Sequence, residues 1–104
     1  MKKIINGKKY DTETADLIVE WDNGYFNNDF NYCSEDLYRT KKGNWFIHGE
    51  GGAMTKYRVH CGSNNWSGSS AIEILSDDEA FKWLQEHDFA DEIEKYFSDR
   101  VEEA

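Results

Sequence analysis

Asp36-Leu37-Tyr38-Arg39-Thr40-Lys41-Lys42-Gly43-Asn44-Trp45-Phe46-Ile47-His48 is the stretch that decides the fold of this chain. Its two ends, Asp36–Thr40 and Trp45–His48, have the composition of β-strands. Between them, Lys41–Asn44 has the composition of a four-residue turn, with glycine where a positive φ is required. We therefore predict a β-hairpin, which Gly49–Gly52 ends, at the centre of a small antiparallel sheet.

Further strand-like runs lie on both sides of this hairpin. Lys2–Ile5 and Lys8–Tyr10 flank Asn6-Gly7, a strong signal for a type I′ turn, and are predicted to pair with each other. Two later runs are predicted to be a third strand of the central sheet and a last strand, respectively Lys56–Cys61 and Ala71–Leu75. Polar residues dominate the predicted loops, Asp22–Asn31 and Gly62–Ser70.

Residues 12–20 fit two structures. Asp11 or Thr12 can cap a helix that runs to about Glu20, and apolar residues recur there with the spacing of one helix face. The adjacent β-branched residues Ile18 and Val19 favour a strand instead. We predict a short helix and keep the strand as the alternative.

The C-terminal part is predicted to be helical. Ser76 and Glu79 form a capping-box pattern, and a buried face follows on Ala80, Trp83, Leu84 and His87. Asp88 is predicted to cap a second helix. The apolar residues of that helix form one stripe about 140° wide. That stripe consists of Phe89, Ile93, Tyr96, Phe97 and Val101. With 104 residues and sixteen aromatic side chains, the chain is predicted to form a single α+β domain, residues 1–104.

Negative charge is concentrated in this helical part. The net charge is −9, and Ser76–Ala104 holds eleven acids against three bases, while the preceding residues hold ten acids and nine bases. We expect the acids to form an outward face on a packed helix that repels nucleic acid and attracts proteins that bind nucleic acid. The expected partner-binding residues are Asp77, Asp78, Glu86, Asp91, Glu92, Glu94, Asp99, Glu102 and Glu103, with Trp66, and Tyr25 or Phe26 in their own loops, as exposed aromatic anchors.

Other chemistries have weaker signals. The cysteine and histidine spacings match no zinc pattern, so we expect no metal or other cofactor and two free thiols, Cys33 and Cys61. His48, Glu50 and His60 are the candidates for general acid–base catalysis if they converge. Lys8-Lys9 and Lys41-Lys42 are the alternative candidates for the partner-binding surface, in place of the acidic residues. No long apolar segment or leader pattern is visible, so the expected location is the cytoplasm, away from membranes.

Three segments resemble a known family. These are Lys2–Ala15, Asp36–Gly52 and Ser76–Ala80 followed by Trp83-Leu84, and together they cover about a third of the 104 residues in the same order. They resemble small proteins of phages and conjugative elements of Gram-positive bacteria, a family that includes type II anti-CRISPR proteins.

The resemblance implies a non-enzymatic inhibitor. Its partner would be the type II RNA-guided DNA endonuclease, which holds guide RNA and target DNA in basic channels. Binding would block guide-RNA loading or target-DNA engagement, and no stable direct contact with nucleic acid is expected. Two alternatives stay open: a different protein-interaction module of a mobile element, and a small nuclease that acts on guide RNA through His48, Glu50 or His60.

Overall fold

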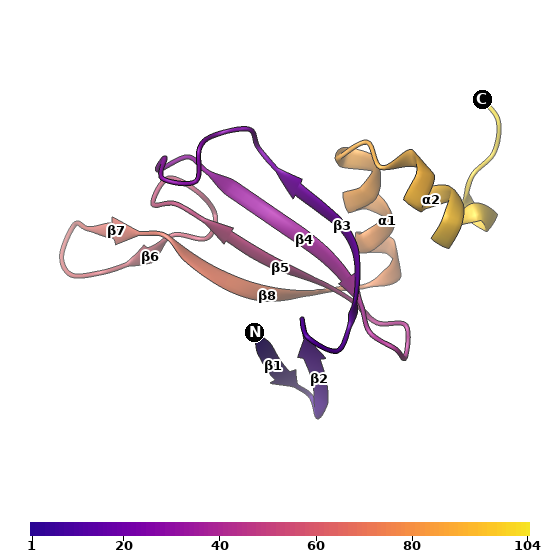
Figure 1. Cartoon of the computed structure of the whole chain (residues 1–104), viewed down its shortest axis with the longest axis horizontal. Coiled ribbons are helices and arrows are strands. Elements are labelled where there is room, and N and C mark those ends of the chain that lie inside the picture. Colours follow the sequence, from indigo (N-terminus) through magenta and orange to yellow (C-terminus); the bar gives the residue numbers. More distant parts are fainter.

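A four-stranded antiparallel sheet forms the body of the protein (Figure 1). The computed structural model describes residues 1–104 and gives the strand order β3-β4-β5-β8. These strands are β3 (Asp16–Asp22), β4 (Cys33–Arg39), β5 (Trp45–Gly51) and β8 (Ser69–Leu75). The predicted central hairpin is confirmed as β4–β5, in which Arg39 faces Trp45. It is longer than predicted because both strands continue to the pair Cys33–Gly51.

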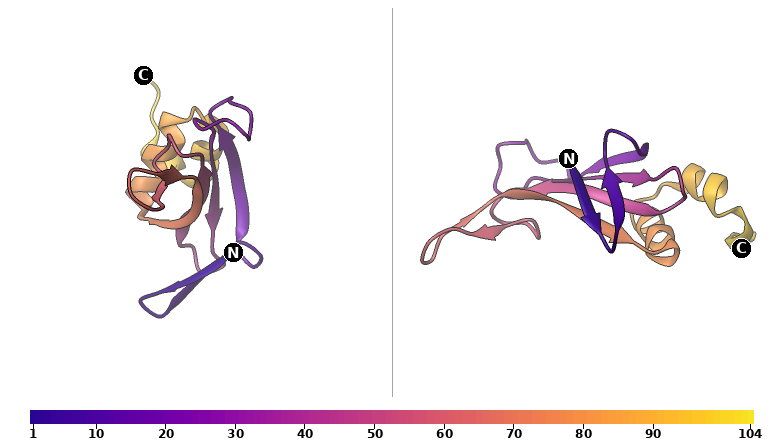
Figure 2. Two further views of the ribbon diagram at one scale, coloured as in Figure 1. Left: turned by 90° about the vertical axis from the view of Figure 1, so that its left-hand side faces the viewer. Right: turned by 90° about the horizontal axis from the view of Figure 1, so that it is seen from below.

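The N-terminal hairpin is also confirmed. Strands β1 (Lys2–Ile5) and β2 (Lys8–Asp11) pair through a turn in which Asn6 and Gly7 have φ angles of 51° and 77°, as a type I′ turn requires. Figure 2 shows this hairpin projecting from the body of the molecule. Its anchor is Tyr10, which packs with Phe46 and Ile72 in a small cluster of buried residues.

The predicted helix over residues 12–20 is wrong, and the strand kept as the alternative is correct. Asp11 caps only a turn, in which its carboxylate accepts a hydrogen bond from Glu13 N and its carbonyl one from Ala15 N. Strand β3 then pairs with β4, and Val19 lies opposite Leu37 in the core. Cross-strand hydrogen bonds and burial of a β-branched side chain therefore outweigh the local helix pattern.

The predicted third strand of the central sheet at Lys56–Cys61 is wrong. Only β6 (Val59–His60) is extended there, and it pairs with β7 (Trp66–Ser67) in a separate two-stranded ribbon. The free edge of β5 is instead occupied by β8, which begins at Ser69, earlier than predicted, and pairs along its whole length. Residues 52–58 have no strand structure, and Tyr57 and Thr55 of this loop pack against Gly49 and Gly51 of β5.

Helix α1 (Asp77–Glu86) begins as predicted. Ser76 Oγ accepts a hydrogen bond from Glu79 N, and Glu79 Oε1 accepts one from Ser76 N, so the capping box is complete. The predicted start of the next helix at Asp88 is wrong. Asp88 has a φ of 61°, its N–H bonds to Gln85 O, and Phe89 N–H bonds to Leu84 O. This is a Schellman arrangement, so Asp88 ends α1.

Helix α2 (Ala90–Tyr96) is shorter than the predicted stripe. It ends at Tyr96 and is followed by the 3₁₀ turn η1 (Ser98–Arg100) and by residues 101–104, which have no regular structure. Ile93 and Phe97 are buried as expected, whereas Val101 is 47% exposed. The predicted helix through Val101 is therefore wrong in its last turn.

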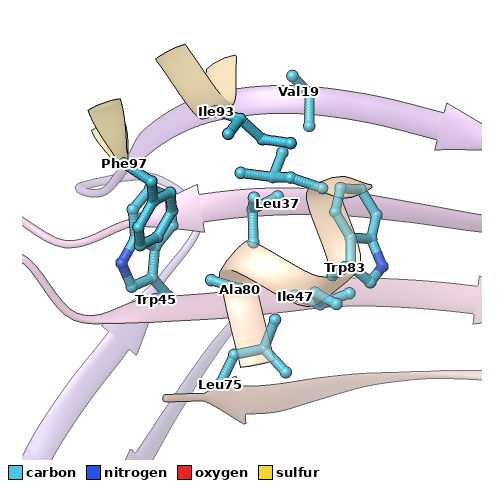
Figure 3. Close-up of a cluster of buried hydrophobic side chains, with 10 residues drawn as sticks. Val19, Leu37, Trp45, Ile47, Leu75, Ala80, Trp83, Ile93 and Phe97 are labelled. Atoms are coloured by element: carbon cyan, nitrogen blue, oxygen red, sulfur yellow. The ribbon is translucent and has the colours of Figure 1, made fainter. Parts of the chain in front are cut away.

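The main core lies between one face of the sheet and the two helices. Figure 3 shows how Leu37, Trp45 and Ile47 from the sheet meet Trp83 and Phe97 from the helical part. Alternation along β5 directs Phe46 to the opposite face, where the N-terminal hairpin packs. The molecule measures 50 × 36 × 19 Å, with the β6–β7 ribbon at one end and α2 at the other (Figure 1). No helix has the length and apolar character needed to cross a membrane.

Candidate functional site

The predicted acidic residues lie at the helical end, on more than one element. Asp77, Asp78 and Glu86 are on α1, and Asp91, Glu92 and Glu94 are on α2. Asp99 is in η1, and Glu102 and Glu103 are in the irregular segment after it. The expected single helix face is therefore wrong for these last three residues, because α2 ends at Tyr96. All nine side chains are exposed except that of Glu92, which is half-buried.

Two of these nine acids form ion pairs within the chain, and the other seven do not. Arg100 pairs with Asp78, and Lys82 Nζ lies 4.0 Å from Glu86 Oε1. Arg100 also lies over the rings of Phe81 and Phe97, at 5.6 and 5.5 Å, so it holds η1 against α1. The remaining seven predicted acids have no ion pair within the chain. These seven are the free acidic set: Asp77, Asp91, Glu92, Glu94, Asp99, Glu102 and Glu103.

A shallow apolar hollow lies beside the free acidic set. Its volume is about 370 Å³, and Phe81, Ile93 and Val101 line it together with Glu94 and Glu102. Exposed apolar surface next to unpaired charge is typical of a protein-binding surface, because the apolar part supplies affinity and the charge supplies orientation and association rate.

Trp66 does not lie with the acidic residues. It is on β7, at the opposite end of the molecule from α2 (Figure 1), and it is 48% exposed. The guanidinium of Arg58 lies 4.5 Å from the centre of its ring, and His60 contacts its edge. Trp66 therefore lies apart from the free acidic set, and the structure does not bring the two into one local surface.

The loops at the Trp66 end expose several apolar side chains. Tyr25, Phe26, Phe30 and Met54 are 51%, 85%, 69% and 67% exposed. Backbone hydrogen bonds fix these loops, since Met54 N donates to Phe30 O at 2.9 Å and Asp29 N donates to Phe26 O at 2.9 Å. The exposure expected for Tyr25 and Phe26 is confirmed, and the structure adds Phe30 and Met54 to a common apolar end.

A buried carboxylate, which sequence reasoning missed, lies beneath the helices. Glu35 is 3% exposed and accepts hydrogen bonds from the hydroxyl of Tyr57 and from Trp83 Nε1, the latter at 3.1 Å. Lys56 Nζ lies 2.7 Å from Glu35 Oε2. Gly49 faces Glu35 across the sheet, and a side chain there would overlap the ring of Tyr57. The network fastens the Gly52–Arg58 loop to the sheet and to α1.

The charges of this network are strongly coupled. Burial by itself would raise the pKa of Glu35, but the hydrogen bonds from Lys56, Tyr57 and Trp83 outweigh it, so the pKa is lowered. Burial and the neighbouring carboxylate raise the pKa of Tyr57. Burial lowers the pKa of Lys56, but the hydrogen bond to Glu35 and the nearby negative charges together outweigh burial, so the pKa of Lys56 is raised. At neutral pH the network is therefore a charged pair with a neutral phenol. Every polar group is satisfied, which indicates a structural role.

The proposed acid–base residues do not form one group. His48 and Glu50 lie on β5, whereas His60 lies on the separate β6–β7 ribbon against Trp66. His48 instead lies opposite Asp36, which lies opposite Glu20, so the three form a row across the sheet face away from the helices. Burial raises the pKa of Asp36, Glu20 raises it further, and His48 lowers it. Alternation along β4 and β5 was the signal that could have found this row.

The two basic hairpins are brought together. Lys8 and Lys9 of β2 and Lys41 and Lys42 of the β4–β5 turn line one hollow. Lys41 is paired with Asp16, and the other three lysines have no ion pair. No group of three or more His, Cys, Asp or Glu side chains is arranged to hold a metal ion. Cys33 is half-buried and Cys61 is exposed, and both are free thiols.

Comparison with known proteins gave no match to any family model, curated protein or solved structure.

Proposed function

We propose that this chain is an anti-CRISPR protein that binds the type II RNA-guided DNA endonuclease and blocks guide-RNA loading. The observation that carries the proposal is the free acidic set, seven exposed or half-exposed acids without an internal partner at one end of the molecule. The resemblance of three segments to the mobile-element family supplies the identity of the partner.

The physical reason is electrostatic complementarity. An endonuclease of this type binds nucleic acid in basic channels, and those channels are open before guide RNA occupies them. A protein surface with unpaired carboxylates is attracted to such a channel at long range and associates faster at low salt. Because the acids are spread over α1, α2, η1 and the C-terminal segment, they present charge on a surface and not along a single helix.

The apolar hollow beside these acids completes the proposed contact. Charge alone gives little net affinity, since both partners lose hydration, and buried apolar anchors supply most of the binding energy in protein interfaces. Val101 and Phe81 line this hollow together with Glu94, Glu102 and Arg100, which is paired with Asp78. In this proposal they replace Trp66 as the anchor.

The apolar end formed by Tyr25, Phe26, Phe30 and Met54 favours a second candidate function. It is exposed, its loops are fixed by hydrogen bonds, and it lies far from α2 (Figure 1). A regulatory module that binds another protein of the mobile element or its host would use this end. Capture of a partner that is lost in Phe26→Ser but kept in a charge-reversed acidic end would support this alternative.

An order-of-addition cleavage assay tests the proposal. Purified protein is mixed with the endonuclease before or after guide RNA, and cleavage of target DNA is measured. We expect strong inhibition when the protein is added first and weak inhibition when guide RNA is already bound. Equal inhibition in both orders would contradict a block of loading, and absence of inhibition in both would contradict the proposed function.

Charge reversal locates the contact. The variant E94K/E102K/E103K changes three acids that have no ion pair and no capping role. The control E13K/E20K/E50K makes the same change in net charge on exposed acids outside the helical end. We expect the first variant to lose inhibition and the control to keep it. Loss in the control alone would place the contact on the sheet.

A further inference from the structure

A basic hollow lies between the N-terminal hairpin and the β4–β5 turn. Its volume is about 580 Å³, within the range of small-molecule sites. Its lysines are Lys8, Lys9, Lys41 and Lys42, which are four of the twelve basic residues of a chain with a net charge of −9. No Asp or Glu lines the hollow. The local charge is therefore opposite in sign to that of the whole molecule.

Three of these lysines are available to a ligand. Lys41 Nζ is held 2.7 Å from Asp16 Oδ1, whereas Lys8, Lys9 and Lys42 are exposed and have no ion pair. Lysines around one hollow raise its electrostatic potential, so the hollow attracts an anion, which gains charge-assisted hydrogen bonds from the ammonium groups that reach it.

Neutral hydrogen-bond donors lie among the lysines. Thr40 Oγ1 accepts a hydrogen bond from Asn44 N at 3.0 Å, which leaves the hydroxyl proton of Thr40 free to donate. Thr14 also lines the hollow, and neither its hydroxyl nor the side-chain amide of Asn44 has a partner within the chain. Hydroxyl and amide donors beside ammonium groups suit the many acceptor oxygens of a phosphate.

The walls of the hollow are fixed. Tyr10 is 4% exposed and meets Phe46 edge to face at 5.6 Å, which holds β2 against the sheet. Thr40 N donates to Asn44 O at 2.8 Å, and Gly43 adopts a φ of 91°, which closes the opposite turn. The backbones that carry the lysines are therefore positioned before any ligand binds, which lowers the entropic cost of binding.

We propose that this hollow binds an oligophosphate group. Several lysines around one hollow match a chain of phosphoryl groups better than a single monovalent anion. Tyr10 is the only aromatic residue in the lining, and it is buried, so the site has no platform on which a base could stack. Recognition therefore rests on phosphate and not on a nucleobase. This site is separate from the proposed endonuclease contact and does not depend on it.

Isothermal titration with tripolyphosphate at about 50 mM salt tests the proposal. We expect saturable binding that weakens as salt increases. The variant K9A/K42A should weaken binding at least about tenfold, because it removes two charge-assisted contacts. The control R58A/K82A loses the same charge beside Trp66 and on α1, outside the lining of the hollow, and binding should change less than about twofold because distant charges are screened. Absence of saturable binding, or equal weakening in both variants, would overturn the proposal.

Two further ligands distinguish the source of the phosphate. A nucleoside triphosphate should bind as tightly as tripolyphosphate, because the base makes no contact. A 5′-hydroxyl oligonucleotide, which has phosphodiesters but no oligophosphate, should bind more weakly than either. Tighter binding of this oligonucleotide, lost in K9A/K42A, would show that the hollow recognises a strand backbone and would overturn the oligophosphate assignment.

Discussion

Glu35 is expected to be the polar residue on which stability depends most. Replacement by leucine leaves the hydroxyl of Tyr57 and the indole N–H of Trp83 without an acceptor in the core. An unsatisfied buried donor costs about 1–3 kcal/mol, so two cost about 2–6 kcal/mol. Lys56 adds little, because its side chain is 56% exposed and can be hydrated. We expect Glu35→Leu to lower the free energy of unfolding by about 4 kcal/mol, a large share of the about 5–15 kcal/mol of a typical domain.

Urea unfolding at pH 7, followed by tryptophan fluorescence, measures this change. Glu35→Gln keeps one acceptor oxygen but loses the charge, and we expect it to cost about 1–2 kcal/mol. Glu73 provides the matched control, since its carboxylate is 3.7 Å from the same Lys56 but is exposed. Glu73→Gln should cost less than about 1 kcal/mol. A Glu35→Leu protein that is destabilised no more than Glu73→Gln would refute the reasoning.

Other predictions concern the same network and the helix cap. The pKa of Glu35 is lowered from its usual 4.5 in the folded protein, so the Glu35 carboxylate stabilises the fold above pH 4.5 and this stabilisation is lost as the pH falls through the lowered value. The difference in unfolding free energy between wild type and Glu35→Gln should therefore shrink as urea titrations are moved from pH 6 toward pH 3. Gly49→Ala forces a Cβ atom into the ring of Tyr57 and should cost about 3 kcal/mol in the same assay, whereas Gly24→Ala, whose Cβ meets nothing, should cost only its backbone strain; equal costs would show that Tyr57 moves freely. Ser76→Ala removes the acceptor for Glu79 N and should cost about 1 kcal/mol, with no such loss for Ser98→Ala, which makes no side-chain cap.

Local chemistry explains which elements could be predicted from the sequence. Both hairpins were predictable because their turns are specified by adjacent residues, Asn6-Gly7 in one and Lys41–Asn44 in the other. The start of α1 was predictable because a capping box needs only Ser76 and Glu79. Each of these signals is contained within a few consecutive residues.

Competition between distant segments explains the errors. Residues 16–22 became a strand because β4 offers them a partner, and Lys56–Cys61 stayed out of the sheet because β8 occupies the edge of β5. Asp88 has the composition of a helix start, yet the hydrogen bonds of Phe89 N and Asp88 N to α1 make it a helix end. The local pattern alone decides none of these three outcomes.

The candidate sites show the same division. The charge of the helical end was apparent from composition, but its division among α1, α2 and the irregular C-terminus was not. The Glu35 network joins residues that are 22 and 48 positions apart, so no spacing rule could find it. A charged residue on the same strand face as Leu37 was the only available hint.

Binding of the guide-free type II endonuclease to immobilised wild-type protein, E94K/E102K/E103K and E13K/E20K/E50K is the most direct test of the central claim. The proposed contact predicts that the endonuclease binds wild type and E13K/E20K/E50K, fails to bind E94K/E102K/E103K, and is released from wild type by guide RNA or by high salt. Equal binding of the endonuclease to all three proteins, or none to wild type, would contradict the claim that the free acidic set is the surface that inhibits it.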